Sequence, residues 1–447
     1  MKIFKKLFSS QLRINMLSGT ATTIVNLVVV AVSYPLYLHF LGYEKYGVWL
    51  VMTTVLTFAS LGNLGIGTAV MKLVAEEYGR GDILGVQRYV STAIAVLFLS
   101  GSVVLTMLLI FRNPIVSAFK LDEGNSQTVL WLIPYVGVLC IYSFIVQVLE
   151  AALSGLDRMD MTNYIRTFSH AIQVIISGLL IAFGLGVKGM LIGSFTSYVI
   201  IHVLTILCIG RIVHMNIWNI KNINSLYLNR LIQFGGTVFS GSLINMLFSP
   251  FNKLMLSRYA GVATLPVYEI VYTGSMYLRS LIEAGLRALV PRISYLSAEL
   301  NYQTAGKILG IYRRSMKLIF VFGTPLYLAF IVLSPFLLKI WLGEKFVETL
   351  PSTFQLMLVG TFLSLLGVPA YYTLMGSNKV RYCLISHLIQ TASNSFIVIA
   401  IVISTHTLYV QHVVLAVILG MSISSFYLIR MLQTIMKELW RSDKIHY

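Results

Sequence analysis

Acidic residues are scarce in this 447-residue chain, which has 16 Asp and Glu against 33 Lys and Arg, and only 11% of its residues are charged. Nearly all of the acids fall between long apolar segments or near their ends, and Glu283 alone lies well inside one, with Glu150 and Glu269 about a turn from an end. Paired carboxylates of the kind that hydrolases use are therefore not expected, and neither is a sodium or proton site built from several acids.

Signatures of disulfides, nucleotides and metals are missing as well. The three cysteines, Cys140, Cys208 and Cys383, lie far apart within or beside apolar segments, which favours buried small side chains over a disulfide framework. No GxxxxGK[ST] sequence occurs, and the histidines are scattered without the spacing of metal ligands. We therefore expect a protein that is not an enzyme and that has no catalytic residue, no cofactor and no metal site.

Long apolar runs are what the chain has instead. Hydrophobic residues make up 57% of the chain and the mean hydropathy is +0.82, which excludes an ordinary soluble enzyme. Runs of about 20 residues recur from end to end, and each can cross a bilayer core about 30 Å thick. The sequence predicts an all-α polytopic membrane protein with about twelve spans: 14–41, 46–71, 88–111, 128–153, 163–185, 188–210, 231–257, 264–290, 316–341, 350–375, 380–403 and 408–436.

Lysine and arginine are distributed unevenly among the segments that join the predicted spans. With the N-terminus inside, and with basic residues near the ends of spans counted with the adjoining loop, the cytoplasmic side carries 24 of the 33 basic residues, the outer side carries 8, and Arg279 remains within a span. The positive-inside rule then places both termini in the cytoplasm. The net charge of +17 therefore indicates orientation and not a nucleic-acid partner.

The two halves of the chain resemble each other. A shift of 219 residues lays Leu41-Gly42 on Ala260-Gly261, and a shift of 221 lays LSGLDR (153–158) on LMGSNK (374–379). Because six spans is an even number, both halves would share one orientation, related by an axis along the membrane normal. We expect two pseudo-symmetric six-helix lobes with a central cleft, at 1–211 and 229–447, a cytoplasmic linker at 212–228, and a second long cytoplasmic loop at 292–315.

The eighth predicted span carries a stripe of charge. Arg279, Glu283 and Arg287 recur every four residues and therefore share one helix face. Arg279 lies about 22 Å from the outer start of its helix at about 1.5 Å per residue, and an arginine near the centre of a span costs about 2.5–3.5 kcal/mol. Two interpretations stay open: a structural Arg279–Glu283 ion pair, or a cationic surface that binds an anionic ligand.

The repeat favours the ligand. Arginine grips phosphate through two parallel hydrogen bonds, which suits an anionic substrate. The matching positions of the first half are the neutral residues Ser60, Leu64 and Thr68, so the stripe occurs once, whereas an architectural feature would be expected twice. Lys253 either extends the cationic surface or extends its ammonium to the membrane interface.

Other candidates concern coupling, packing and bending. Glu150, close to the cytoplasmic end of the fourth span, is a second candidate beside Glu283 for an ion pair or a coupling role. The acidic turn Asp157–Asp160 is expected to be solvated. Small residues allow helices to pack closely, and proline allows them to bend. The candidates for packing or hinge positions are Gly62, Gly65, Gly67, Pro35, Pro250 and Pro369.

A stretch in the first two spans, LGYEKYGVWLVMTTVLTFASLGNLGIGTAVMKLVAEEYGRGD (41–82), carries a family resemblance. It resembles the polysaccharide-transport branch of the multidrug/oligosaccharidyl-lipid/polysaccharide (MOP) exporters, the O-antigen and capsule repeat-unit flippases. The ALSGLDR turn and the twelve-span layout agree with that branch. Asn63 stands where many relatives carry the acid of a "DLG" motif, so a coupling role for an acid at that position is not expected here.

The resemblance implies a V-shaped, MATE-like bundle in the bacterial inner membrane that works by alternating access. Its substrate would be an undecaprenyl-pyrophosphate-linked oligosaccharide for O-antigen, capsule or exopolysaccharide, moved from the cytoplasmic to the outer leaflet. Its partners would be membrane lipids, a polysaccharide polymerase and a chain-length regulator. Cavities in the family tend to be cationic, which fits Arg279 and Arg287.

Two other functions are weighed against this one. A cation-coupled multidrug exporter of the same superfamily predicts acids in the first or seventh span, and neither span has one in its core. A membrane-embedded polysaccharide polymerase or ligase predicts a large outer loop with catalytic residues, and all the predicted outer loops are short.

Overall fold

The computed structural model describes residues 10–213, 223–287, 289–297 and 302–444, and these ranges contain helices and no strand. The chain divides into two compact units, Met1–Pro250 and Phe251–Tyr447. The predicted all-α class is confirmed. The boundary between the units falls inside one long helix, whereas the lobe limits expected at 211 and 229 remain predictions.

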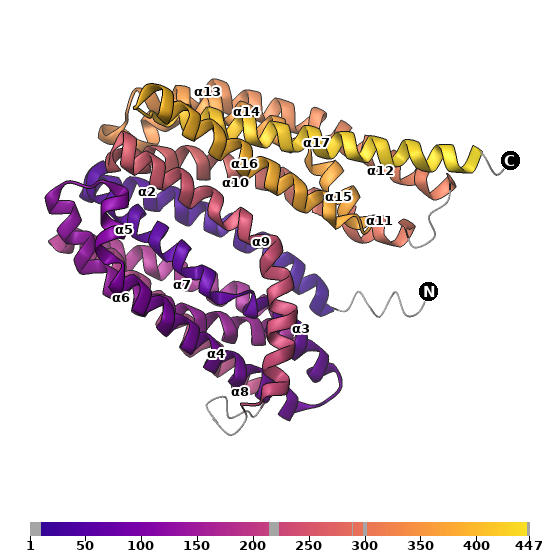
Figure 1. Cartoon of the computed structure of the whole chain (residues 1–447), viewed down its shortest axis with the longest axis horizontal. Helices are drawn as coiled ribbons and strands as arrows, with labels where there is room; N and C mark the ends of the chain where they lie inside the picture. The colour runs from indigo at the N-terminus through magenta and orange to yellow at the C-terminus, as the bar shows by residue number, and fades with distance from the viewer. Residues whose placement is uncertain (1–9, 214–222, 288, 298–301, 445–447) are drawn as a thin grey trace. The chain divides into compact units, whose positions relative to one another are not determined.

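In the first unit, long helices run alongside one another, as Figure 1 shows for α4, α6 and α7. The closest pairs are α4 with α6, α7 with α8, and α2 with α7. The elements are α2 (Ser10–Ala59), η1 (Ser60–Asn63), α3 (Ile66–Gly79), α4 (Ile83–Ile110), α5 (Arg112–Phe119), α6 (Glu123–Gly155), α7 (Met159–Leu180), η2 (Ile181–Leu185), α8 (Val187–Ile212) and α9 (Ser225–Ala260), whose last residues enter the second unit.

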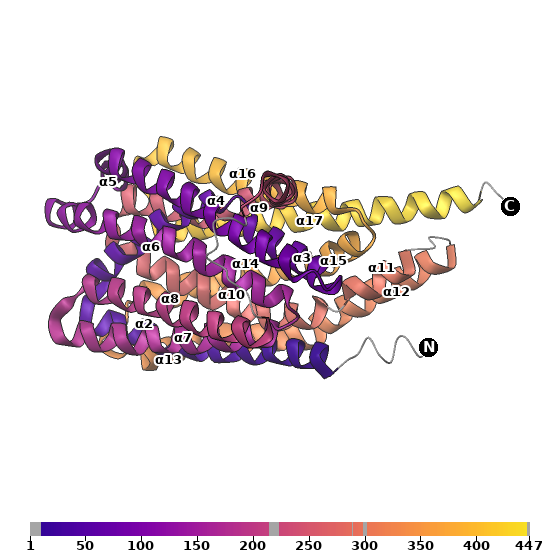
Figure 2. The same ribbon diagram turned by 90° about the horizontal axis from the view of Figure 1, so that it is seen from below.

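In the second unit, α16 packs along α17, and α14 packs on both α17 and α10. Figure 2 shows α11 and α12 together at the end of the unit towards which α17 runs. The elements are η4 (Val262–Thr264), α10 (Leu265–Arg287), α11 (Leu289–Ser297), α12 (Tyr302–Leu318), η5 (Ile319–Gly323), α13 (Thr324–Leu342), η6 (Gly343–Lys345), α14 (Thr349–Leu365), α15 (Val368–Gly376), α16 (Val380–Thr405) and α17 (Val410–Lys444).

The loop expected at 292–315 was a wrong prediction, because α11 and α12 occupy most of it. Ile293 and Ile308 are fully buried there, in one apolar cluster with Leu374, Leu428 and Leu432 from α15 and α17. Apolar residues on one face of each short helix therefore anchor both helices to the unit, although the many basic residues make the segment look like a polar loop.

Nine helical segments are long and apolar enough to cross a membrane within the described ranges. They cover ten of the twelve predicted spans, because Ala21–Asn63 contains parts of the first two, separated by a break at Gly42. The seventh and eighth predicted spans coincide with α9 and α10, which carry the charges of Lys253, Glu269 and Arg279 and are not among the nine.

The internal repeat is visible in the backbone. Left-handed backbone conformations pair across the halves at Gly42 and Gly261, Lys120 and Gly343, Asp157 and Asn378, and Gly186 and His406. The offsets are 219, 223, 221 and 220 residues, which agree with the two shifts read from the sequence. Because a left-handed residue marks a chain reversal, the same order of turns occurs twice.

The turn between α6 and α7 is more ordered than expected. Asp160 is 4% exposed and accepts hydrogen bonds from Gln11 at 3.0 Å and from Arg158 at 3.1 Å. Its carboxylate thereby raises the pKa of the Arg158 guanidinium. Asn15 also donates to Asp157 at 3.2 Å. The turn expected to be solvated instead fastens the start of α2, because the amides of Gln11 and Asn15 reach it.

The candidate glycines and prolines occupy different environments. A Cβ on Gly62 would lie 2.7 Å from Val104, and one on Gly65 would meet the backbone of Gly235, whereas Gly67 has open space. Close packing of backbone against backbone therefore occurs at Gly65, which also has a positive φ of 71°.

Pro35 and Pro250 lie inside α2 and α9, and Pro369 lies in the first turn of α15, a position that proline tolerates. Their hinge role stays a prediction.

Replacing Gly65 with alanine is expected to lower the stability of the first unit. The new Cβ would strain a left-handed backbone and press on Gly235, at a cost of about 1–3 kcal/mol. Gly67→Ala is the matched control, because nothing lies within 4 Å of its added Cβ. Thermal unfolding of the two purified variants in detergent measures the difference, and equal melting temperatures would contradict the packing role of Gly65.

Candidate functional site

Arg279 and Glu283 form an ion pair along α10. Arg279 Nε lies 3.6 Å from Glu283 Oε2, one helical turn away, and the two side chains are 21% and 23% exposed. The other oxygen of Glu283 accepts a hydrogen bond from the hydroxyl of Tyr372 on α15, at 2.7 Å. Glu283 is therefore held between two helices, and no pattern in the sequence indicated Tyr372 as its partner.

The pairing of Arg279 is incomplete. Its Nε is buried and has no hydrogen-bond partner among the described residues. An ion pair at 3.6 Å is longer than the 2.7–2.9 Å of a charge-assisted hydrogen bond, and Glu283 divides its oxygens between Arg279 and Tyr372. A guanidinium whose Nε has no hydrogen-bond partner among the described residues retains the capacity to bind a further anion.

The other two predicted cations differ from Arg279. The backbone of Arg287 ends α10, and its side chain lies outside the described part of the structure. Lys253 on α9 pairs with Glu269 on α10 at 2.7 Å, with the two side chains 11% and 18% exposed. Its positive charge is thus balanced locally, and its role toward a substrate remains a prediction.

Buried side-chain amides join three helices next to Lys253. Asn252 on α9 donates to the hydroxyl of Tyr268 on α10 at 3.1 Å and accepts from Asn394 on α16 at 2.9 Å. Both asparagines are fully buried. Hydrogen bonds of this kind link helices within a membrane and fix their register. They position the α9–α10 pair that carries Lys253 and Arg279.

In the first unit, Glu150 on α6 has a partner that the sequence reading missed. Arg166 on α7 donates from Nε and Nη2 to the two carboxylate oxygens of Glu150, each at 3.0 Å. The Glu150 side chain is 8% exposed. This two-point pairing neutralises both charges. Arg166 falls inside the predicted span 163–185 and was not singled out from the sequence, so its contact with Glu150 was not anticipated.

The Glu150–Arg166 pair lies where two cavities meet. One cavity, of about 390 Å³, is also lined by Asn63, Thr68 and Ser154. The other, of about 570 Å³, is lined by Trp49, Gln173, Ser194 and Tyr198 among others. Gln147 lines both and accepts a hydrogen bond from Asn63. Spacing alone did not identify this lining: Gln147, Glu150 and Ser154 recur along one face of α6, but the spacing does not show which helix that face meets.

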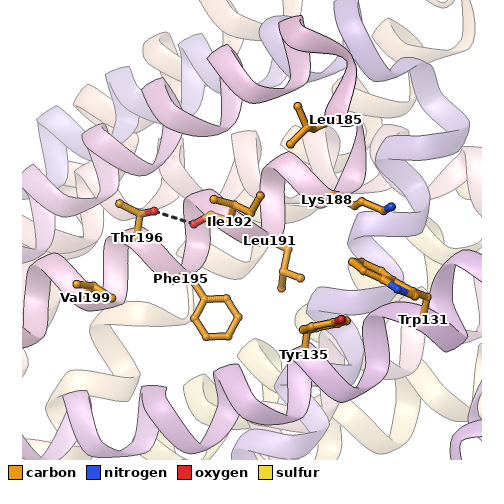
Figure 3. Close-up of a pocket in the computed structure, with 9 residues that line it drawn as sticks. All are labelled: Trp131, Tyr135, Leu185, Lys188, Leu191, Ile192, Phe195, Thr196 and Val199. Atoms are coloured by element: carbon orange, nitrogen blue, oxygen red, sulfur yellow. Dashed lines mark hydrogen bonds between the residues drawn. The ribbon is translucent and has the colours of Figure 1, made fainter.

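A third cavity in the first unit is chemically different. It is a groove of about 450 Å³. Apolar side chains such as Leu191, Ile192 and Phe195 line it (Figure 3). At one end the ammonium of Lys188 lies 4.6 Å from the centre of the Trp131 ring. Trp131 and Ile192 are each 43% exposed, so the groove opens outward. An open apolar surface with an aromatic side chain at its end is typical of a face toward lipid.

The fold and these sites define a class: a polytopic membrane protein with an internal repeat. A family model described as "Polysaccharide biosynthesis protein" matches residues 39–351. The match covers more than two thirds of the chain, and the chain therefore belongs to that family. The predicted family, membrane class and absence of enzyme activity are confirmed.

Individual relatives agree with this assignment. The chain is 22% identical over 350 residues to the "Putative O-antigen transporter" of Shigella flexneri, covering 78% of this chain and 80% of that protein. It also has the fold of an inward-facing multidrug resistance MATE transporter of the MOP superfamily (TM-score 0.71, 14% identity, 94% and 96% coverage). The lipid II flippase MurJ is similar too (TM-score 0.74, 12% identity, 94% and 87% coverage).

Removing Arg166 is expected to destabilise the protein, because Glu150 would keep a buried charge without its cation. Arg166→Ala should cost about 1–3 kcal/mol, and the neutral double variant Glu150→Gln/Arg166→Gln should recover part of this loss. Lys72→Ala serves as the control, since its partner Glu76 is exposed and such pairs contribute about 0–1 kcal/mol. If thermal unfolding shows the same change for Arg166→Ala and Lys72→Ala, the structural importance of the pair is refuted.

Proposed function

We propose that this protein is a flippase that moves undecaprenyl-pyrophosphate-linked oligosaccharide units from the cytoplasmic to the outer leaflet by alternating access. The units would serve O-antigen, capsule or exopolysaccharide synthesis. The family assignment supports a role in polysaccharide biosynthesis, and the fold shared with MurJ and MATE proteins supports transport.

The observation that carries the proposal is the incompletely paired guanidinium of Arg279. A pyrophosphate brings negative charge into the membrane, where charge is expensive to hold. Arg279 offers donors in a planar fork that fits phosphate oxygens, while Glu283 and Tyr372 keep its helix face in place. Arg287 would add a second positive charge about two turns along α10. Lys253 would contribute once its contact with Glu269 opens.

The multidrug exporter is the less supported alternative. Organic cations require negative charge at their site, but segments 14–41 and 231–257 contain no Asp or Glu. Within α9 and α10 the acids Glu269 and Glu283 are each engaged by a cation. An anionic substrate therefore agrees better with the second unit.

The proposed setting follows from the substrate. The protein would lie in the bacterial inner membrane with both termini in the cytoplasm, where the lipid-linked unit is assembled. A polysaccharide polymerase would use the delivered unit on the outer face, together with a chain-length regulator. Neutral sugars would cross in a wet polar environment while the prenyl tail stays in the lipid.

Arg279→Ala is expected to reduce surface polysaccharide to a tenth or less in a strain that depends on this gene, about the effect of losing one charge-assisted contact. Arg279→Lys should retain part of the function, because charge remains but the fork geometry is lost. Immunoblots of surface polysaccharide at matched protein levels measure the effect. Arg313→Ala is the control, since Arg313 is exposed on α12.

Two outcomes would contradict the role of Arg279 as a ligand. One is normal surface polysaccharide in Arg279→Ala cells. The other is restoration of function by the exchange Arg279→Glu/Glu283→Arg, which keeps the pair but reverses its order along the helix. That result would assign the two residues to a structural ion pair.

A further inference from the structure

The two cavities that meet at Glu150 and Arg166 follow α6 through much of its length. Their lining residues on α6 run from Val136 to Ser154. At about 1.5 Å per residue this corresponds to about 27 Å, close to the thickness of a bilayer core of about 30 Å. Together the two cavities therefore extend along much of α6 and are not confined to a shallow depression at one end of the helix.

The lining of the cavities combines apolar side chains such as Met52 and Val136 with polar ones, and its acids and bases carry no net charge. Glu150 and Arg166 are the carboxylate and the guanidinium present, and they neutralise each other. The remaining polar groups are amides and hydroxyls, with His170 hydrogen-bonded to Asn26 at 3.4 Å. Such a surface does not attract phosphate or an organic cation over a neutral molecule. It favours an uncharged ligand that is rich in hydrogen-bonding groups.

The hydrogen-bonding capacity of these groups is only partly used. Arg166 has five N–H donors and spends two on Glu150. The amide nitrogen of Gln173 donates to Ser194 at 3.0 Å, which leaves its carbonyl oxygen as an acceptor. Thr53 donates to the carbonyl of Leu50 at 2.9 Å, and its hydroxyl oxygen can still accept. Trp49 adds an aromatic wall to the larger cavity.

We propose that these joined cavities of the first unit bind the uncharged sugar residues of the transported molecule. Donors and acceptors along α6, α7 and α8 replace the water that the sugar hydroxyls lose, and the cavity volumes lie in the range of ligand sites, about 300–1,000 Å³. This inference rests on the proposed flippase function and extends it, because it assigns glycan recognition to residues other than Arg279.

Binding measurements on the full-length protein in detergent test this assignment with two probes. One probe is the lipid-linked oligosaccharide extracted from the host strain, and the other is undecaprenyl pyrophosphate without sugar. Gln173→Leu removes an amide from the cavity, and Thr53→Val removes a hydroxyl at almost unchanged shape. Gln355→Leu is the matched control, because its amide joins α14 to the carbonyl of Ile331 at 2.8 Å and lines neither cavity.

Gln173→Leu is expected to weaken binding of the oligosaccharide probe about tenfold, and Thr53→Val should weaken it in the same direction. Binding of the sugar-free probe should stay within about twofold of the wild type for both variants, and Gln355→Leu should leave both probes unchanged. The difference between the probes matters, since a general loss of folding would weaken both equally.

Three results would overturn the inference. Unchanged binding of the oligosaccharide probe by both cavity variants would exclude the cavity as its site. Equal weakening of the two probes would assign Gln173 and Thr53 to structure alone. In either case the flippase function would stand if Arg279→Ala weakens both probes. A wild-type protein that binds neither probe would overturn the flippase function and this inference together.

Discussion

A half-buried arginine whose pairing is incomplete is the constraint on which the second unit depends. Arg279 keeps its charge within α10 through a 3.6 Å contact with Glu283, which Tyr372 holds from α15. Because Nε has no partner among the described residues, the helix carries a cost that further contacts would reduce. A ligand with phosphate oxygens would supply those contacts, which links the cost of the charge to the substrate.

The two units compensate buried charge in different ways. In the first, the charges of Arg166 and Glu150 compensate each other through two hydrogen bonds of 3.0 Å. The lining of the cavities beside them has no net charge and includes amides and hydroxyls. In the second, Lys253 is matched by Glu269 but Arg279 is only partly matched by Glu283. The shared fold of the repeats thus carries two chemistries, one suited to uncharged hydroxyl-rich groups and one to anions.

The sequence predicted those features that depend on local pattern. Apolar runs located the membrane helices. Gly42 and Gly261 marked equivalent chain reversals, because glycine adopts a left-handed backbone conformation more readily than other residues do. The shared helix face of Arg279 and Glu283 could be predicted, because residues i and i+4 lie on the same side of a helix. The helix at α12 was missed, since its burial rests on a few residues such as Ile308 amid many basic ones.

Contacts between helices could not be predicted from the spacing of residues along the chain. Glu150 meets Arg166, and Glu283 meets Tyr372, because particular helices pack together, which no spacing within one helix encodes. The polar lining of the first unit was missed for the same reason: Gln147 and Glu150 share a face of α6, and Arg166 and Gln173 share a face of α7, but no spacing within either helix shows that the two faces meet. Asp160 was expected to lie in solvent and is buried instead, because Gln11 on α2, far away in sequence, donates a hydrogen bond to it.

Direct transport by the purified protein tests the central claim most closely. Liposomes would carry lipid-linked oligosaccharide on one leaflet, and a lectin that cannot cross the membrane would report its arrival on the other. The account predicts that the wild-type protein accelerates this arrival over protein-free liposomes and that Arg279→Ala slows it about tenfold or more. Arrival no faster than in protein-free liposomes, or equal rates for Arg279→Ala and wild type, would contradict it.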